Sequence, residues 1–197
     1  MSVKMNKIRQ DKKLFFRVKK KDKDAFIEAY DLYADDIYRF IFFKIGRDEE
    51  AKDLTSAVFL KVWNYAQSRG LDESKSLRAF IYKTARNLII DHYRQLRETE
   101  SRLDDGERVL EELLADEKQD LEKQSEILSD MEMIKEGLGL LKDEYREIIL
   151  LRFIDELSFA EISEVTGKTA GNVRVLTFRA LQALKDLLAE KNQKINS

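Results

Sequence analysis

Two arginines near the C-terminus lie in a stretch whose composition suits contact with a nucleic acid. Residues 166–185 hold four Lys or Arg and no acid, for a net charge of +4. On a helix, four of its residues would share one face at spacings i, i+1, i+4 and i+5: Arg174, Val175, Phe178 and Arg179. A guanidinium can donate two hydrogen bonds to guanine in the major groove, which discriminates bases by about 1–3 kcal/mol. The face therefore predicts base reading; the alternative is a helix with merely solvated arginines.

A turn signal precedes this face at the position that a helix-turn-helix requires. Ile162 belongs to a short apolar-faced helix, Gly167 allows the chain to turn sharply, and Val173 begins the apolar stripe of the next helix. In such a motif the second helix enters the major groove. The alternative is a helical hairpin without a ligand. The absence of acids from residues 166–185 favours the DNA-binding motif.

The residues needed for catalysis or metal binding are missing. The chain has no cysteine and one histidine, His92, which excludes thiolate sites and most imidazole sites. His92 follows Asp91, but no serine in a strained elbow accompanies the pair, and the sequence has no phosphate-binding glycine loop or zinc-protease signature. We expect no enzyme activity, no catalytic residue, no cofactor and no metal.

The net charge of −2 conceals a strong segregation of charge along the chain. Residues 1–23 sum to +8 and residues 98–136 sum to −10, whereas residues 77–97 carry five bases against Asp91 alone, for +4. The molecule thus has two basic stretches of helix size, a basic arm and an acidic middle. The arm is compatible with phosphate contacts or with a solubilising tail, and the acidic segment with mimicry of nucleic acid or with a solvated tether.

Apolar spacing predicts an all-α fold of two small helical domains joined by a flexible acidic linker, the C-terminal domain being a helix-turn-helix. Apolar residues recur every three or four positions almost everywhere, and the chain contains no proline. We predict a basic N-terminal arm over 1–23, a first domain over 24–97, a linker over 98–126 and a second domain over 127–190. The most apolar stretch is too short to span a bilayer and no export signal follows the basic N-terminus, so we expect no membrane insertion and a cytoplasmic protein.

The chain resembles bacterial RNA polymerase sigma factors of the extracytoplasmic-function (ECF) group. The resemblance lies in the segments DLTSAVFLKVW (53–63), LRAFIYKTARN (77–87) and DHYR (91–94), and in the helix-turn-helix block over 141–188. The matching blocks have the order and spacing of the family, with an unpatterned linker between them. The resemblance implies a factor that binds core RNA polymerase and directs promoter recognition, DNA melting and transcription initiation.

The resemblance also implies roles for residues of the first domain. Asp53, Ser56 and Ala57 would lie on the helix that binds core polymerase, although the family usually has Gln and an acid at the last two positions. Five residues would serve the −10 region of the promoter: Arg69 and Gly70 in a base-capturing loop, Arg86 and Asn87 on the DNA side of a helix, and Arg94 toward phosphates. Phe80, where the family often has Trp, fits the core better than a base-stacking wedge.

In the second domain, the resemblance implies eight residues at the −35 region. They are Arg146, Lys168, Thr169, Asn172, Arg174, Val175, Phe178 and Arg179. Val175 and Leu176 replace a common Ser and Arg, which we expect to alter promoter preference without loss of the fold.

The implied partners are core RNA polymerase, double-stranded promoter DNA, its melted single strand and an anti-sigma factor. One alternative is a helix-turn-helix regulator that binds DNA alone. A pure protein-interaction module is a third possibility, but it would leave the two +4 stretches unexplained.

Overall fold

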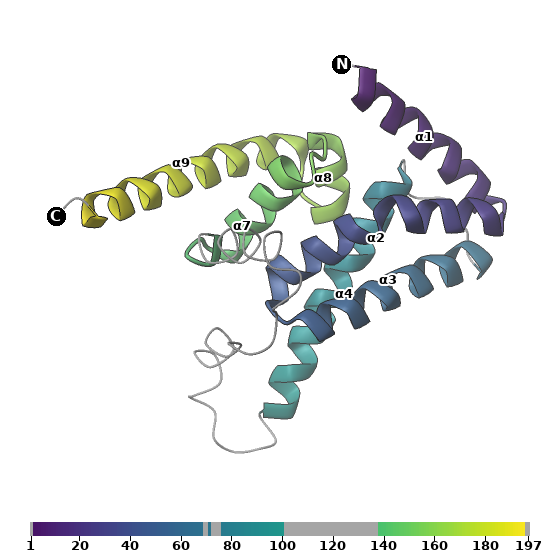
Figure 1. Ribbon diagram of the computed structural model, residues 1–197, viewed down its shortest axis with the longest axis horizontal. Helices are drawn as coiled ribbons and strands as arrows, with labels where there is room; N and C mark the ends of the chain where they lie inside the picture. The colour runs from purple at the N-terminus through teal and green to yellow at the C-terminus, as the bar shows by residue number, and fades with distance from the viewer. Residues whose placement is uncertain (1, 69–70, 72–75, 101–137, 196–197) are drawn as a thin grey trace.

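The computed structural model describes residues 2–68, 71, 76–100 and 138–195, and its regular elements in those ranges are helical (Figure 1). The first domain contains α1 (Ser2–Lys19), α2 (Lys23–Ile45), α3 (Asp48–Ser68) and α4 (Leu77–Glu100). The second contains α7 (Asp143–Ile149), the π-helical turn η1 (Leu150–Ile154), α8 (Phe159–Thr166) and α9 (Ala170–Ile195). The all-α prediction is confirmed.

Local sequence explains where the helices of the first domain begin and end. Asp22 caps α2, because its carboxylate accepts a 3.0 Å hydrogen bond from the backbone N–H of Ala25. Gly46 ends the helix in the left-handed region, at φ 86°, and its N–H donates to the carbonyl of Phe42. Gly46 therefore separates α2 from α3.

The core of the first domain brings α1 together with α2, α3 and α4. Tyr33, Phe40 and Tyr82 are among its largest fully buried side chains. Leu14 and Val18 of α1 are also fully buried, and α1 packs against both α2 and α4. The segment that we predicted to be a basic arm therefore contains a helix of the first domain's core, because its apolar residues recur at helical spacing between the lysines.

The second domain folds around its turn as the motif predicts. Ser158 and Glu161 form a reciprocal capping box at the start of α8, and Gly167 follows the helix with φ 70°. Helices α7 and α8 both pack against α9, with Ile148, Ile162 and Val173 buried between them. The helix-turn-helix prediction is confirmed in its geometry.

The two domains lie against each other. Helix α8 packs against α4, and α9 extends away from the first domain toward the C-terminus (Figure 1). Helix α4 continues to Glu100, past the boundary that we predicted at residue 97. The rest of the predicted linker, 101–126, and the start of the second domain, 127–137, lie outside the described residues.

Candidate polymerase and nucleic-acid interfaces

One face of α3 carries the residues predicted to contact polymerase. Asp53 and Ser56 are exposed and Ala57 is half-buried, while the opposite face, which includes Val58 and Val62, is fully buried in the core. Leu60 continues the exposed face one turn further and is 61% exposed. Leu60 is a further candidate that the sequence analysis did not name, although its spacing of four from Ser56 places it on the same face.

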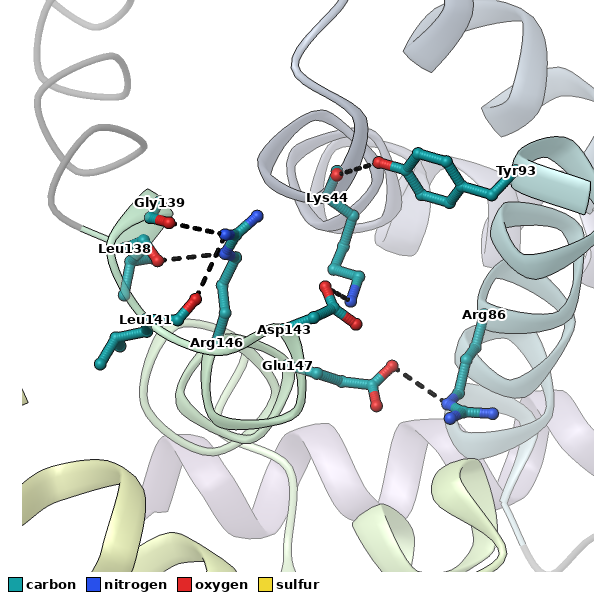
Figure 2. Close-up of polar contacts among 9 residues, drawn as sticks. All are labelled: Lys44, Arg86, Tyr93, Leu138, Gly139, Leu141, Asp143, Arg146 and Glu147. Atoms are coloured by element: carbon teal, nitrogen blue, oxygen red, sulfur yellow. Dashed lines mark hydrogen bonds and ion pairs between the residues drawn. The ribbon is translucent and has the colours of Figure 1, made fainter. Parts of the chain in front are cut away.

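The face of α4 that points to solvent differs from the expected one. Asn87 and Arg94 are exposed, and Lys83 and Ile90 complete a stripe with them at spacings i, i+4, i+7 and i+11. Arg86 instead points toward α7, where its Nε lies 3.0 Å from Oε1 of Glu147 (Figure 2). The structure therefore does not bring Arg86 and Asn87 to one face, as adjacent helical residues differ by about 100°. The stripe adds Lys83 and Ile90 to the candidates.

The start of α4 is fixed by side chains from two other segments. Ser76 accepts a hydrogen bond from the N–H of Ala79, and Asp11 of α1 accepts one from the N–H of Arg78 at 2.9 Å. These acceptors satisfy amides that a helix N-terminus leaves free. The candidate loop residues Arg69 and Gly70 lie outside the described residues.

Phe80 packs against the core of the first domain. It is half-buried, and its ring meets that of Tyr65 edge-on at a centroid distance of 5.8 Å. This environment supports the expected core position rather than a base-stacking wedge.

Helix α9 presents the four predicted base-reading residues together. Arg174 and Arg179 are exposed, Val175 is 49% exposed and Phe178 is 71% exposed. The opposite side of the helix packs inward through Val173, Leu176, Thr177 and Ala180. Leu176 thus belongs to the core of the second domain, which explains why an apolar residue occupies that position. Figure 1 shows that α9 lies on the side of the second domain away from α2 and α4.

The turn before α9 uses two predicted residues for its own structure. Thr169 caps α9, since its Oγ1 accepts a 3.2 Å hydrogen bond from the N–H of Asn172, whose side chain is exposed. The ammonium of Lys168 lies 2.8 Å from a carboxylate oxygen of Glu144 on α7. The exposed Asn172 side chain lies at the start of α9, two residues before Arg174.

The Arg146 side chain is engaged in hydrogen bonds within the second domain. Its guanidinium donates to the carbonyls of Leu138 at 3.0 Å, Gly139 at 2.9 Å and Leu141 at 3.4 Å (Figure 2). These bonds hold the turn that leads into α7. The Arg146 side chain thus helps to shape the second domain.

A buried carboxylate lies between the two domains. The side chain of Asp155, at the end of η1, is 1% exposed, and its Oδ1 lies 3.7 Å from Nη2 of Arg39 on α2. Neither of its oxygens has a hydrogen-bond partner among the described residues. Burial raises the pKa of Asp155 to about 7, Arg39 opposes this rise, and Asp36 adds to it.

The chain matches known proteins along both domains. A family model of sigma-70 region 2 matches residues 29–99, and one of sigma-70 region 4 matches residues 131–184. The ECF RNA polymerase sigma factor SigW of Bacillus subtilis is 30% identical over 187 residues, which span 91% of this chain and 97% of SigW. The chain belongs to the ECF RNA polymerase sigma factor family.

A further relative agrees with this family, and two solved structures share the fold. The ECF sigma factor SigM of Bacillus subtilis is 29% identical over 160 residues, or 81% of this chain and 93% of SigM. The fold is similar to that of CnrH in complex with the cytosolic domain of CnrY, with a TM-score of 0.66, 19% identity, and coverage of 92% of this chain and 98% of the other. It is also similar to the sigma factor RpoE of Bartonella quintana in complex with the anti-sigma factor NepR, with a TM-score of 0.61, 22% identity, and coverage of 83% and 96%.

The ECF sigma factor directs promoter recognition with RNA polymerase, and its two matched regions correspond to the two domains of the structure. Helix α1 lies before the region 2 match. In the part of the chain that the structure describes, no helix is long and apolar enough to cross a membrane.

The single histidine, His92, lies against a carboxylate of α3. Its Nε2 lies 3.0 Å from Oε2 of Glu50 on α3. Among the described residues, no group of three His, Asp or Glu side chains could hold a metal ion. The contact of His92 ties α4 to α3.

Proposed function

We propose that this ECF sigma factor divides its task among three exposed helix faces. The α3 face, defined by Asp53, Ser56, Ala57 and Leu60, binds core RNA polymerase. The α4 stripe, defined by Lys83, Asn87, Ile90 and Arg94, joins Arg86 in contacting the −10 element as it melts. The α9 face, defined by Arg174, Val175, Phe178 and Arg179, reads the −35 element.

The observation that carries this proposal is the composition of the α9 face. Two arginines flank two exposed apolar side chains on a helix that follows a helix-turn-helix turn, and residues 166–185 contain no acid. Arginine suits guanine, and apolar side chains suit the methyl group of thymine. Attraction between DNA phosphates and the neighbouring Lys and Arg side chains would add affinity without sequence preference.

The α3 face supports binding to another helix. Leu60 offers an apolar anchor, and Asp53 and Ser56 offer polar contacts at its edge. An exposed leucine with small neighbours lets a partner helix approach closely, in the manner of ridges packing into grooves. The coiled coil of the largest bacterial polymerase subunit, which the resemblance implies, is such a partner.

The sigma factor carries no reaction chemistry of its own in this proposal. Its arginines and apolar side chains bind and orient the promoter, and the polymerase active site makes the transcript. We place the factor in the cytoplasm, because polymerase and chromosomal DNA are there. An anti-sigma factor is a further proposed partner, since the similar sigma factor RpoE was captured in complex with one.

Holoenzyme reconstituted from core polymerase and each variant tests the base-reading face. We expect Arg174→Ala to reduce discrimination between the selected −35 duplex and a scrambled one by about 1–3 kcal/mol. Lys185→Ala is the matched control, because Lys185 is an exposed cation further along α9. It should weaken both duplexes equally. Equal discrimination by Arg174→Ala and the parent would contradict the proposal.

A further inference from the structure

Helix α1 presents to solvent a stripe of cations around one aromatic ring. The side chains of this stripe recur at spacings i, i+3, i+4, i+7 and i+11 and are all exposed: Arg9, Lys12, Lys13, Phe16 and Lys20. Lys20 follows the helix by one residue, and its N–H still donates to the carbonyl of Phe16 at 3.3 Å, which continues the helical register. We call these five residues the α1 face.

The opposite side of α1 is fixed to the first domain. Leu14 and Val18 are fully buried there. Asp11 accepts hydrogen bonds from the Tyr33 hydroxyl at 2.8 Å and from the N–H of Arg78 at 2.9 Å. Because these contacts set the rotation of the helix, the α1 face is a defined surface of the domain and not a loose basic tail.

The charge of the α1 face is not neutralised by neighbouring acids. The only acid between residues 9 and 21 is Asp11, which is buried. Arg17, which lies outside the α1 face, is paired with Asp22 at 2.8 Å and with Glu28 at 2.9 Å. In the described part of the chain, by contrast, no carboxylate pairs with the four cations of the α1 face. These cations are therefore available to an anionic ligand.

The α1 face lies near the surface proposed to contact melted DNA. Asp11 joins α1 to the N–H of Arg78 in the first turn of α4. The α4 stripe begins at Lys83, five residues and about 8 Å further along that helix. A helix with its side chains is about 10 Å across, so a DNA strand of a few nucleotides is long enough to contact both surfaces.

The combination of cations and an exposed ring suits single-stranded DNA. Phe16 is 62% exposed, with Lys12 and Lys13 one turn before it and Lys20 one turn after it. Lysine and arginine attract the phosphates of a strand, and an aromatic ring stacks on an unpaired base. A duplex keeps the faces of its bases covered, so it would leave the Phe16 ring without a partner.

We propose that the α1 face binds single-stranded DNA, with its cations on the phosphates and the Phe16 ring stacked on a base. In the holoenzyme this DNA is the melted promoter strand beside the −10 element, a part of the inference that rests on the proposed role of the α4 stripe. The match to sigma-70 region 2 begins at residue 29. The α1 face would thus extend the DNA-binding surface of the first domain beyond that region.

Binding of the full chain to fluorescent, mixed-sequence single-stranded DNA tests the α1 face. We expect Phe16→Ala to weaken binding at least about fivefold, because stacking on one base is lost, and Phe16→Tyr to bind as the parent does. Phe153→Ala is the matched control, because it removes a phenylalanine that is 47% exposed in the second domain. Its affinity should equal that of the parent. Parent-like affinity of Phe16→Ala, or an equal loss in Phe153→Ala, would overturn the proposal.

The salt dependence of the same binding measures the contribution of the cations. A variant carrying Arg9→Gln, Lys12→Gln and Lys13→Gln changes exposed positions only, and glutamine forms helices about as well as lysine and arginine. The slope of log affinity against log salt should become shallower by about 2, since each phosphate contact of a single strand contributes about 0.7. An unchanged slope would overturn the proposal.

Vesicles of anionic phospholipid separate DNA from a membrane surface as the ligand. A helix that lies on a membrane buries a whole apolar face in it, whereas Leu14 and Val18 are already buried in the domain and leave only Phe16 to insert. We therefore expect Phe16→Ala and the parent to bind vesicles equally. Loss of vesicle binding in Phe16→Ala with full retention of DNA binding would overturn the proposal in favour of a membrane-binding face.

Holoenzyme assays distinguish failure of this proposal from failure of the proposed function. The role of the α4 stripe fails if holoenzyme carrying Asn87→Ala and Arg94→Ala opens promoters as the parent does, and this result leaves the binding of the free chain untouched. Holoenzyme carrying Phe16→Ala should form open complexes with a lifetime at least about fivefold shorter than that of the parent. An unchanged lifetime would overturn the assignment of the α1 face to the melted promoter strand.

Discussion

Arg86 on α4 and Glu147 on α7 form an ion pair across the two domains, with 3.0 Å between Nε and Oε1. The pair joins positions 61 residues apart in the chain. Helix α4 consequently displays Lys83, Asn87 and Arg94 to solvent while Arg86 is occupied.

Leu60 is the apolar centre of the proposed polymerase face, so its replacement should weaken the complex. We expect Leu60→Asp to lower affinity for core polymerase at least about tenfold, because a carboxylate cannot be buried against a partner helix without cost. Affinity measured by titration of labelled factor with core polymerase checks this.

Leu140 supplies the control for this prediction. It is 69% exposed and lies in the second domain, just before α7. Leu140→Asp should leave polymerase affinity close to that of the parent. Equal losses for the two variants would argue against a specific α3 face.

Asp11 connects α1 to α2 and α4, and its loss should destabilise the first domain. The buried carboxylate accepts a 2.8 Å hydrogen bond from the Tyr33 hydroxyl and a 2.9 Å bond from the Arg78 N–H. Asp11→Ala leaves both donors without their acceptor, at a cost of about 1–3 kcal/mol for each. Urea unfolding gives the change in the free energy of unfolding. Lys12→Ala, at an exposed neighbouring position, should be almost neutral; a similar value for both variants would refute the role of Asp11.

Asp155 should make stability depend on pH. Its pKa rises from the ordinary 3.8 to about 7 in the folded chain, chiefly through burial. The groups that influence it are Arg39 and Asp36 on α2 and Arg78 and Tyr82 on α4. The folded state favours the protonated form of Asp155. Its contribution to the free energy of unfolding is therefore fully present below about pH 4 and is lost as the pH rises through about 7.

The variant Asp155→Asn isolates this effect. The amide cannot ionise, so the variant should gain about 2 kcal/mol of stability relative to the parent between pH 5 and pH 8. Unfolding by urea at several pH values gives the difference between the two proteins. A constant difference over this range would show that Asp155 is already ionised in the folded chain.

Phe178 should report on thymine methyl groups in the −35 element. Burying one methyl group contributes about 0.8 kcal/mol, or about fourfold in affinity. Holoenzyme should therefore bind a selected −35 duplex about fourfold more weakly when the contacted thymine is replaced by uracil. Phe178→Ala should remove this preference, whereas Lys185→Ala should keep it. A preference that persists in Phe178→Ala would assign the contact to another residue.

The sequence predicted the local features of this fold well. Periodic apolar residues predicted the all-α fold, and Gly167 predicted the turn of the helix-turn-helix, because helices and their caps depend on neighbouring residues. The grouping of Arg174, Val175, Phe178 and Arg179 on one exposed face followed from the same periodicity.

Contacts between distant segments could not be predicted in this way. The position of Arg86 against Glu147, the capping of α4 by Asp11 and the burial of Asp155 depend on how helices pack, and single-sequence periodicity carries no signal for that. The lysines between the apolar positions of α1 concealed a core helix. Leu60 was overlooked for the opposite reason, because an exposed leucine in an apolar pattern is easily assigned to the core.

Run-off transcription with core polymerase, genomic DNA and mapped transcript starts measures whether this sigma factor gives RNA polymerase its promoter specificity. We expect a defined set of starts that requires the factor and disappears in a variant carrying Arg174→Ala and Arg179→Ala. Starts that are the same with and without the factor would contradict it.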